Sequence, residues 1–229
     1  MVALYDRIAD LYDRLAAPSW ERTIGRRAIQ CVRGQLRQYT RPGARVLDVG
    51  AGTGRSAVLV LEQAEPNQVV LTDLSVKMLT RARRRLVASR VQLVQADATS
   101  LPFPDESFDL VLSLWMLETL PDPLLALSEC LRVVRTEGRV LTAFSSAPKA
   151  RLQRLRAWLI GRAMESWFSG RFLVEQERPL HTCTMDCMHR YELGLATVAS
   201  FGKRCQITAL GAAGAFLLGA ALSFACWAA

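Results

Sequence analysis

Lysine and histidine are scarce in this sequence of 229 residues, which contains two histidines and only three lysines, Lys77, Lys149 and Lys203. The net charge of +8 is therefore carried by arginine. An excess of positive charge can indicate a nucleic-acid or membrane-binding protein, but no recognised nucleic-acid-binding motif accompanies it here. The composition consequently argues against nucleic acid as a partner.

We also expect no signal peptide, because Met-Val-Ala-Leu-Tyr-Asp-Arg has no basic start followed by an apolar run. The six cysteines are scattered, and a chain with 51% hydrophobic residues can bury a globular core without disulfide bonds. We therefore expect free thiols and a cytoplasmic protein.

Short apolar segments alternate with stretches of helical periodicity between residues 45 and 144. The apolar runs predict strands at 45–49, 69–72, 91–95, 109–113 and 139–144. Helical spacing predicts helices over 3–39 with a break at Pro18, from 55 to about 63, around 74–86, and at 124–134. This alternation favours an α/β fold, with a parallel sheet and helices on both faces.

The pattern is looser after residue 144. Leucines at helical spacing predict a helix around residues 151–168, with a basic side and with Trp158, Trp167 and Phe168 making this region apolar. A short helix over Thr184–Leu193 and a strand over Leu195–Ser200 are predicted to follow.

A group of soft ligands lies in the same region, at His181, Cys183, Cys187 and His189. Structural zinc sites usually contain Cys-x-x-Cys pairs, which this segment does not have. Cys183 and Cys187 are instead four residues apart, which suits one apolar face of the predicted helix. We therefore expect no metal site here.

A glycine-rich turn and three acidic residues indicate a cofactor site. Residues 50–54 have Gly-x-Gly-x-Gly spacing, not the Gly-x-Gly-x-x-Gly of dinucleotide-binding turns. Asp48, Asp73 and Asp97 lie at the carboxyl ends of the first three predicted strands, which is the edge where open α/β sheets bind ligands. The three carboxylates suit S-adenosylmethionine (SAM), whose sulfonium, ribose and adenine they can contact respectively.

Each of these features also has a structural interpretation. Glycine-rich turns occur in many doubly wound folds, Asp73 can cap the helix that follows it, and Asp97 can cap a turn. The coincidence of all three acids in register with the strands favours the cofactor site over these alternatives.

Four motifs carry a resemblance to a known family. They are Tyr5-Asp-x-x-Ala9-x-x-Tyr12-Asp13, Val46-Leu-Asp-Val-Gly-Ala-Gly-Thr-Gly54, Thr72-Asp-Leu-Ser-Val-Lys-Met-Leu79 and Gln95-Ala-Asp-Ala-Thr-Ser-Leu-Pro-Phe-Pro-Asp-Glu-Ser-Phe-Asp109. Over residues 1–145 the sequence resembles the class I SAM-dependent methyltransferases, in particular the ubiquinone/menaquinone C-methyltransferase and phospholipid N-methyltransferase branch. One departure is Arg135-Thr-Glu-Gly138, where the family usually has a Lys-Pro-Gly turn.

The resemblance implies a Rossmann-like, mostly parallel sheet of seven strands and SAM as the cofactor. It places the methionine part of SAM on Asp48 and the glycine turn, the ribose on Asp73, the adenine on Asp97 and Ala98, and the reactive methyl beside Ser113 and Leu114. The complete candidate set is Asp48, Gly50, Ala51, Gly52, Thr53, Gly54, Asp73, Leu74, Met78, Asp97, Ala98, Ser113 and Leu114.

No catalytic group can be assigned from the sequence. Methyl transfer from a sulfonium requires alignment and exclusion of water, and a general base only where the acceptor must lose a proton. Glu118 and His181 are the acid–base candidates, each with an alternative role in pairing or packing. Tyr5 and Tyr12 can form a lid over the donor or pack their helix onto the core.

The domain organisation follows from these segments. We expect one methyltransferase domain over 1–205, made of a helical lid (1–40), a cofactor-binding core (41–145) and a substrate-side region (146–205). Residues 206–229 form an apolar tail, and no charged residue follows Arg204. This tail can anchor the protein on the cytoplasmic face of a membrane or supply a last strand, and both interpretations stay open.

The sequence therefore predicts a methyltransferase for a small, apolar acceptor such as a quinone precursor or a lipid. One alternative is an RNA or protein methyltransferase, suggested by the positive charge. Another is a non-catalytic, membrane-associated interaction module that keeps only the fold; the intact glycine turn and acids argue against it.

Overall fold

The computed structural model describes residues 2–16, 22, 25–63, 65–86, 90–146, 188–193 and 195–203. Several predicted features lie outside these residues: the basic helix around 151–168, the His181, Cys183 and Cys187 group, and the tail at 206–229. Within the described part, no helix combines the length and apolarity that a membrane span requires.

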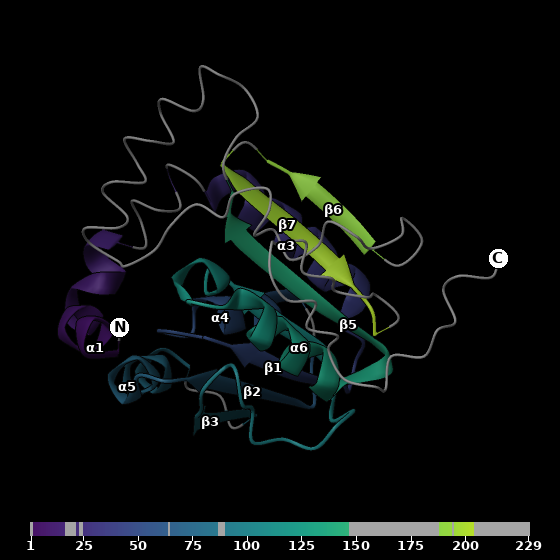
Figure 1. The fold of residues 1–229 in the computed structure, drawn as a ribbon, viewed down its shortest axis with the longest axis horizontal. Helices are drawn as coiled ribbons and strands as arrows, with labels where there is room; N and C mark the ends of the chain where they lie inside the picture. Colours follow the sequence, from purple (N-terminus) through teal and green to yellow (C-terminus); the bar gives the residue numbers. More distant parts are fainter. Residues whose placement is uncertain are drawn as a thin grey trace, which may run out of the picture.

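A seven-stranded sheet forms the centre of the molecule, in the order β3-β2-β1-β4-β5-β7-β6 (Figure 1). Its strands are β1 (Arg45–Val49), β2 (Gln68–Asp73), β3 (Val91–Gln95), β4 (Phe108–Leu114), β5 (Val134–Ser145), β6 (Met188–Glu192) and β7 (Ala196–Phe201). The first five are parallel, whereas β7 and β6 pair antiparallel to their neighbours. The predicted mostly parallel, Rossmann-like sheet is confirmed.

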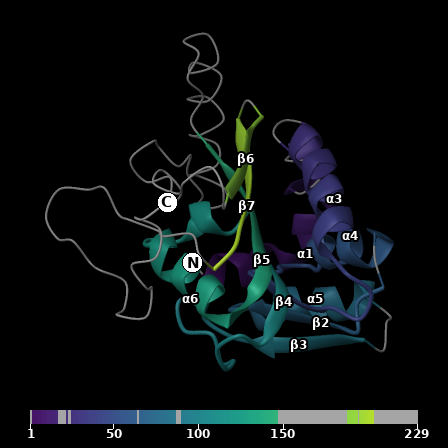
Figure 2. The same ribbon diagram turned by 90° about the vertical axis from the view of Figure 1, so that its right-hand side faces the viewer.

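Helices cover both faces of this sheet. They are α1 (Val2–Leu11), which continues into the π-helix η1 (Tyr12–Ala16), then α3 (Arg26–Tyr39), α4 (Arg55–Gln63), α5 (Val76–Arg85), the 3₁₀-helix η3 (Leu117–Thr119) and α6 (Pro123–Val133). The apolar sides of α3, α4 and α5 share one core cluster, and α6 packs in the other. Figure 2 shows α6 and α3 on opposite sides of the strands.

Because both faces of the central strands are covered, these strands consist of continuous apolar runs. Four of the five residues of β1 are buried, and so are six of the seven residues of β4. This is why the sequence predicted the strands as short hydrophobic runs and not as alternating ones.

Two sequence predictions need correction at the carboxyl-terminal side of the sheet. The helix predicted over Thr184–Leu193 is wrong for residues 188–192, which form β6 and pair with β7. The two strands are joined where the Leu193 N–H donates to the Ala196 carbonyl at 2.8 Å. A short apolar segment carries too little periodicity to separate helix from strand, and here the pairing with β7 decided.

The fifth strand also begins earlier than the apolar run indicated. Val134 already pairs with Phe108, and the register then shifts so that Leu110 pairs with Arg139. The departure at residues 135–138 is accommodated in this irregularity, because the chain there is extended and mostly exposed. Gly138 is required at this position, since a Cβ would lie 2.7 Å from the Asp109 carbonyl oxygen.

Candidate functional site

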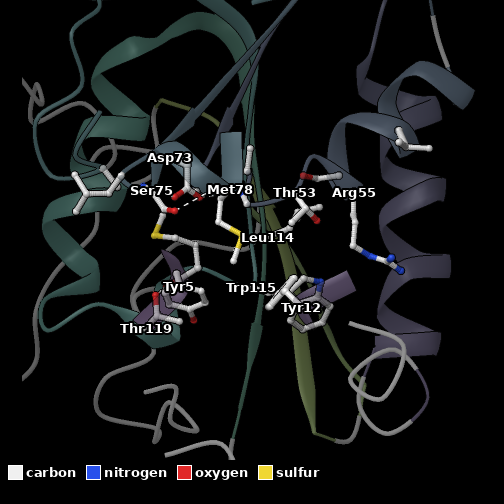
Figure 3. Close-up of a pocket in the computed structure, with 18 of the residues that line it drawn as sticks. Tyr5, Tyr12, Thr53, Arg55, Asp73, Ser75, Met78, Leu114, Trp115 and Thr119 are labelled. Carbon is white, nitrogen blue, oxygen red and sulfur yellow. Dashed lines mark hydrogen bonds between the residues drawn. The ribbon is translucent and has the colours of Figure 1, made fainter. Parts of the chain in front are cut away.

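A cavity of about 460 Å³ opens at the carboxyl edge of the parallel strands (Figure 3). Its size is that of a pocket for a cofactor or a small ligand. Ten of the thirteen candidate residues line it: Gly50, Ala51, Gly52, Thr53, Asp73, Leu74, Met78, Asp97, Ala98 and Leu114. The ends of four neighbouring strands thus meet at one site, as expected for an open α/β sheet.

Three candidate residues are not part of the described lining: Asp48, Gly54 and Ser113. Asp48 is 1% exposed, and its Oδ2 accepts a hydrogen bond from the Ser56 hydroxyl at the start of α4. Burial raises the pKa of this carboxyl to about 7, and the bond from Ser56 opposes the shift. Asp48 therefore lies beneath the turn, outside the described cavity lining, and its Oδ1 is buried without a hydrogen-bond partner among the described residues.

The glycine turn follows directly from backbone conformation. Gly50, Gly52 and Gly54 have φ angles of +68°, +54° and +77°, a region that glycine adopts at low cost. A Cβ on Gly50 would overlap the side chain of Met116, and one on Gly54 would lie 2.9 Å from Leu86. Gly52 has no atom within 4 Å of that position, so its backbone is open to the cavity.

Asp73 closes β2 and is held in a fixed orientation. Its Oδ2 accepts from the Gly52 N–H at 2.8 Å, and its Oδ1 accepts from the Ser75 N–H at 2.8 Å. Burial raises the pKa of this carboxyl, and the backbone hydrogen bonds partly offset the effect. Ser75, and not Asp73, caps α5, because its hydroxyl accepts from the Met78 N–H.

Asp97 combines a turn cap with a place in the cavity wall. Its Oδ1 accepts from the N–H and the hydroxyl of Thr99, at 2.8 and 2.7 Å, and these bonds lower the pKa of the carboxyl. The structural interpretation of Asp97 therefore holds. None of the described residues bonds to its Oδ2, and the backbone of Ala96 and Ala98 lies in the same wall.

A second wall comes from the segment after β4, which the sequence analysis did not identify. Trp115, Met116, Thr119 and Leu120 all line the cavity. Trp115 has a φ of +63°, an uncommon conformation for an aromatic residue, and its N–H donates to the Ala143 carbonyl at 2.7 Å. The rule that ligands bind beyond strand ends could have found this wall, because Trp115 directly follows β4.

Residues of α3 and α4 also line the cavity and were missed. They are Ile29, Arg33, Arg55, Ser56, Val58, Leu59 and Glu62. Arg33 and Glu62 form an ion pair at 3.2 Å between the two helices. Their helical spacing looks like that of ordinary amphipathic helices, so only the packing of α3 on α4 shows which side chains reach the site.

Two tyrosines from the N-terminal helices complete the site. The rings of Tyr5 and Tyr12 pack edge to face, with centroids 6.4 Å apart, and both line the cavity. In Figure 3 they lie with Trp115 below Asp73 and Thr53. Burial raises the pKa of both phenols, that of Tyr12 to about 12, so both hydroxyls keep their protons at neutral pH.

The acid–base candidates lie in different parts of the chain. Glu118 is buried behind the cavity wall, between Leu117 and Thr119 in η3, and its Oε1 accepts from the hydroxyl of Ser145. His181 lies outside the described residues. Within the part of the chain that the structure describes, no group of three or more metal-ligating side chains occurs.

Comparison with known proteins shows which proteins this chain resembles. Residues 47–142 match the family model described as a methyltransferase domain. The chain is 36% identical over 159 residues to a demethylmenaquinone methyltransferase of Clavibacter sepedonicus. The matched region covers 66% of this chain and 60% of that protein. It is 42% identical over 113 residues to a ubiquinone/menaquinone biosynthesis C-methyltransferase of Ectopseudomonas mendocina. That match covers 47% of this chain and 44% of the relative. The chain thus spans less than two thirds of these relatives' length.

Solved structures agree on the fold. A Bacillus halodurans protein classed with the methyltransferases is 25% identical, with a TM-score of 0.57 and coverage of 70% of each chain. A SAM-dependent methyltransferase of Thermotoga maritima is 20% identical, with a TM-score of 0.59. The superposition covers 89% of this chain and 100% of that structure. The class I methyltransferase fold and the resemblance to the quinone C-methyltransferase branch are both confirmed.

Proposed function

We propose, from the premise that this chain carries a methyltransferase domain on the class I fold, that it transfers a methyl group from S-adenosylmethionine to a small, apolar, quinone-related acceptor. Because the chain spans only 60% of the demethylmenaquinone methyltransferase that it resembles, the activity is our inference for the whole protein. The main support for this proposal is the position of Asp73 at the cavity edge. Hydrogen bonds from the glycine turn and from Ser75, the cap of α5, hold its carboxylate there.

The described residues fit the parts of this donor. In this proposal the carboxylate of Asp73 also accepts hydrogen bonds from the ribose hydroxyls, and the open backbone at Gly52 leaves room for the methionine part. In this proposal Asp97 and the backbone of Ala98 are the partners of the adenine amino group and ring nitrogen, and Met78 and Leu74 offer apolar surface. Asp48 takes an indirect part, because it holds the turn to α4 through Ser56.

The aromatic side chains suit the charge of the donor. A sulfonium is a cation, and the faces of Trp115, Tyr5 and Tyr12 attract cations while excluding water. When bound, SAM supplies an electrophilic methyl group: a bond forms from that carbon to the acceptor as the sulfur–carbon bond breaks, and a ring-carbon acceptor loses its proton to water or a base. The remaining task of the protein is alignment.

The apolar acceptor is supported by the second wall and by the relatives. Leu114, Trp115, Met116 and Leu120 provide an apolar surface beside the expected methyl position. A rice protein described as a 2-methyl-6-phytyl-1,4-hydroquinone methyltransferase is 37% identical to this chain over 94 residues, and the match covers 27% of that protein. We extend the proposal to a membrane surface as the source of such an acceptor, since quinones with long side chains reside in lipid.

Two measurements test the proposal. Calorimetry with SAM is expected to show binding that Asp73→Ala weakens about 10- to 100-fold, the usual worth of lost charge-assisted hydrogen bonds. Glu137→Ala, which removes an exposed carboxylate, is the control and is expected to bind as the wild type does. Incubation with labelled SAM and demethylmenaquinone in its reduced form is then expected to give a lipid-soluble labelled product; label confined to RNA or protein would reject the acceptor class.

A further inference from the structure

The Tyr-Asp motif at the N-terminus occurs twice, seven residues apart, as Tyr5-Asp6 and Tyr12-Asp13. Seven residues are about two helical turns, so the two copies lie on the same side of α1 and η1, roughly 10 Å apart. The tyrosines line the cavity, and the aspartates bond to the elements beneath. The repeat therefore has two functions, and the proposed chemistry uses only the tyrosines.

The second aspartate closes a ring of hydrogen bonds on the glycine turn. The Thr53 hydroxyl donates to Asp13 Oδ1 at 2.7 Å, and Arg85 Nη2 pairs with Asp13 Oδ2 at 2.8 Å. Arg85 Nη1 also donates to the carbonyl and the hydroxyl of Thr53, at 2.5 and 2.8 Å. One side chain from the N-terminal helices is thus held by α5 and by the glycine turn together.

The first aspartate makes a matching contact at the other end of the cavity. The Ser75 hydroxyl donates to Asp6 Oδ1 at 2.5 Å, and Ser75 also caps α5 and follows the β2 acid, Asp73. The two aspartates consequently reach the two segments that the proposed function assigns to ribose and to the methionine part.

These polar contacts add to the partial packing of the described α1 side chains. Of the α1 side chains whose burial the structure describes, only Ala9 is buried, at 2% exposure. Figure 1 shows α1 at the end of the molecule, lying against α5 and away from the centre of the sheet. An element at the end of the fold, with mostly half-buried described side chains, belongs to the part of a protein that opens most readily, and specific polar contacts can then control its opening.

We propose that the repeated Tyr-Asp motif is a two-point clasp that closes α1 and η1 over the methyl-donor cavity, and that Asp13 with Arg85 and Thr53 sets the rate at which the donor enters and leaves. This inference rests on the proposed function for the identity of the donor. The clasp bonds join protein groups only, so we expect donor binding to leave them unchanged. Weakening them therefore raises the association and dissociation rates together and leaves the dissociation constant nearly unchanged.

That pattern separates a clasp from a binding residue. Loss of a direct donor contact raises the dissociation rate and the dissociation constant together, while the association rate stays the same. Loss of a contact that only stabilises the fold lowers the melting temperature and changes neither rate. Asp13→Asn and Arg85→Gln test the clasp, and Arg84→Gln, on the exposed side of the same helix, is the matched control.

Stopped-flow binding of SAM is the first measurement. We expect each single variant to raise both rate constants about tenfold, as for loss of one charge-assisted contact, and Asp13→Asn/Arg85→Gln to be no faster than the singles, because they remove one shared contact. Arg84→Gln is expected to match the wild type. Unchanged association rates in both single variants would overturn the clasp.

Hydrogen exchange of the α1 amides in the SAM-free protein is the second measurement. We expect faster exchange over residues 2–11 in Asp13→Asn and in Arg85→Gln than in Arg84→Gln, and equal exchange in all three would reject the proposal. This readout does not need the donor. A wild-type protein that failed to bind SAM would therefore count against the proposed function. The hydrogen-exchange rates of the α1 amides would still test the clasp.

Discussion

Glu118 holds Ser145 at the end of β5 through one of its two carboxylate oxygens. Its Oε1 accepts from the Ser145 N–H at 3.2 Å and from the Ser145 hydroxyl at 2.8 Å, whereas Oε2 is buried without a hydrogen-bond partner among the described residues. Burial raises the pKa of this carboxyl to about 7, and the hydrogen bonds from Ser145 partly oppose the shift. A carboxyl group thus keeps its proton up to neutral pH directly behind the cavity wall.

We expect Glu118 to make the folded state less stable as the pH rises. Its pKa is higher in the folded protein than the ordinary 4.5, so the folded state binds the proton more tightly between about pH 4.5 and 7. Glu118→Gln removes this titration. The stability of the variant relative to the wild type is expected to rise by about 2–3 kcal/mol over that range and to level off above it.

Denaturant unfolding at several pH values measures this difference. Glu137→Gln, which changes an exposed glutamate, is the control and is expected to give a curve parallel to that of the wild type. A Glu118→Gln curve that also ran parallel to the wild type would show that Glu118 is ionised throughout, against the interpretation of its burial.

Binding of the proposed donor is expected to release protons near neutral pH. Burial raises the pKa of Asp48 to about 7 and raises that of Asp73 as well. A cationic donor stabilises the charged form of nearby carboxylates and so lowers these pKa values. Affinity for SAM should then rise between about pH 6 and 8, and calorimetry in two buffers of different ionisation enthalpy should detect the released protons. Asp48→Asn is expected to remove most of the release; a binding heat that does not depend on the buffer would contradict the linkage.

Substitutions in the glycine turn are expected to separate stability from binding. Gly50→Ala forces a side chain into a positive φ, at roughly 1–2 kcal/mol, and also displaces Met116. Gly52→Ala carries the same backbone cost but meets no atom within 4 Å, so it should lose less stability while its methyl group enters the cavity and weakens SAM binding.

Gly34→Ala is the control for both, because this glycine lies in α3 with open space around it. Alanine there is expected to raise stability by roughly 0.5–1 kcal/mol, since it lowers the entropy of the unfolded chain. Thermal unfolding and SAM titration of the three variants give the comparison. Equal stability losses for Gly50→Ala and Gly52→Ala would exclude a role for Met116.

Arg132 is expected to matter for stability and not for donor binding. Its guanidinium donates to the carbonyls of Leu101 and Phe103, at 2.9 and 2.8 Å, and pairs with Glu129 and Asp105. It thereby fastens the segment between β3 and β4 onto α6, away from the described cavity lining. Arg132→Gln should cost about 1–3 kcal/mol, because part-buried carbonyl groups lose their charged donor.

Asp105→Asn is the matched control for this network, because the Asp105 side chain is 71% exposed and its ion pair contributes little. Chemical denaturation should show a small effect for Asp105→Asn and a large one for Arg132→Gln, with SAM affinity retained in both. A loss of SAM affinity in the folded Arg132→Gln protein would mean that the segment reaches the site.

The two ends of the motif from Gln95 to Asp109 have different roles. Asp97 and Ala98 at its start line the cavity. Asp109 at its end accepts from the Arg45 N–H at 2.8 Å and pairs with Arg135, so it joins β1 to the irregular start of β5. The sequence showed the resemblance of the whole motif, but only the contacts separate its ligand-side residues from its structural ones.

The sequence by itself determined the five parallel strands, the glycine turn and the acids at the strand ends, because each depends on local patterns: apolar runs, backbone conformation and chain order. Tertiary structure alone decided the rest. It buried Asp48 against Ser56, added Trp115 and Met116 as a wall, paired β6 with β7 where a helix was predicted, and brought Asp13 to Arg85. These outcomes depend on which surfaces pack together, and contacts between residues far apart in the chain leave no periodic pattern in the sequence.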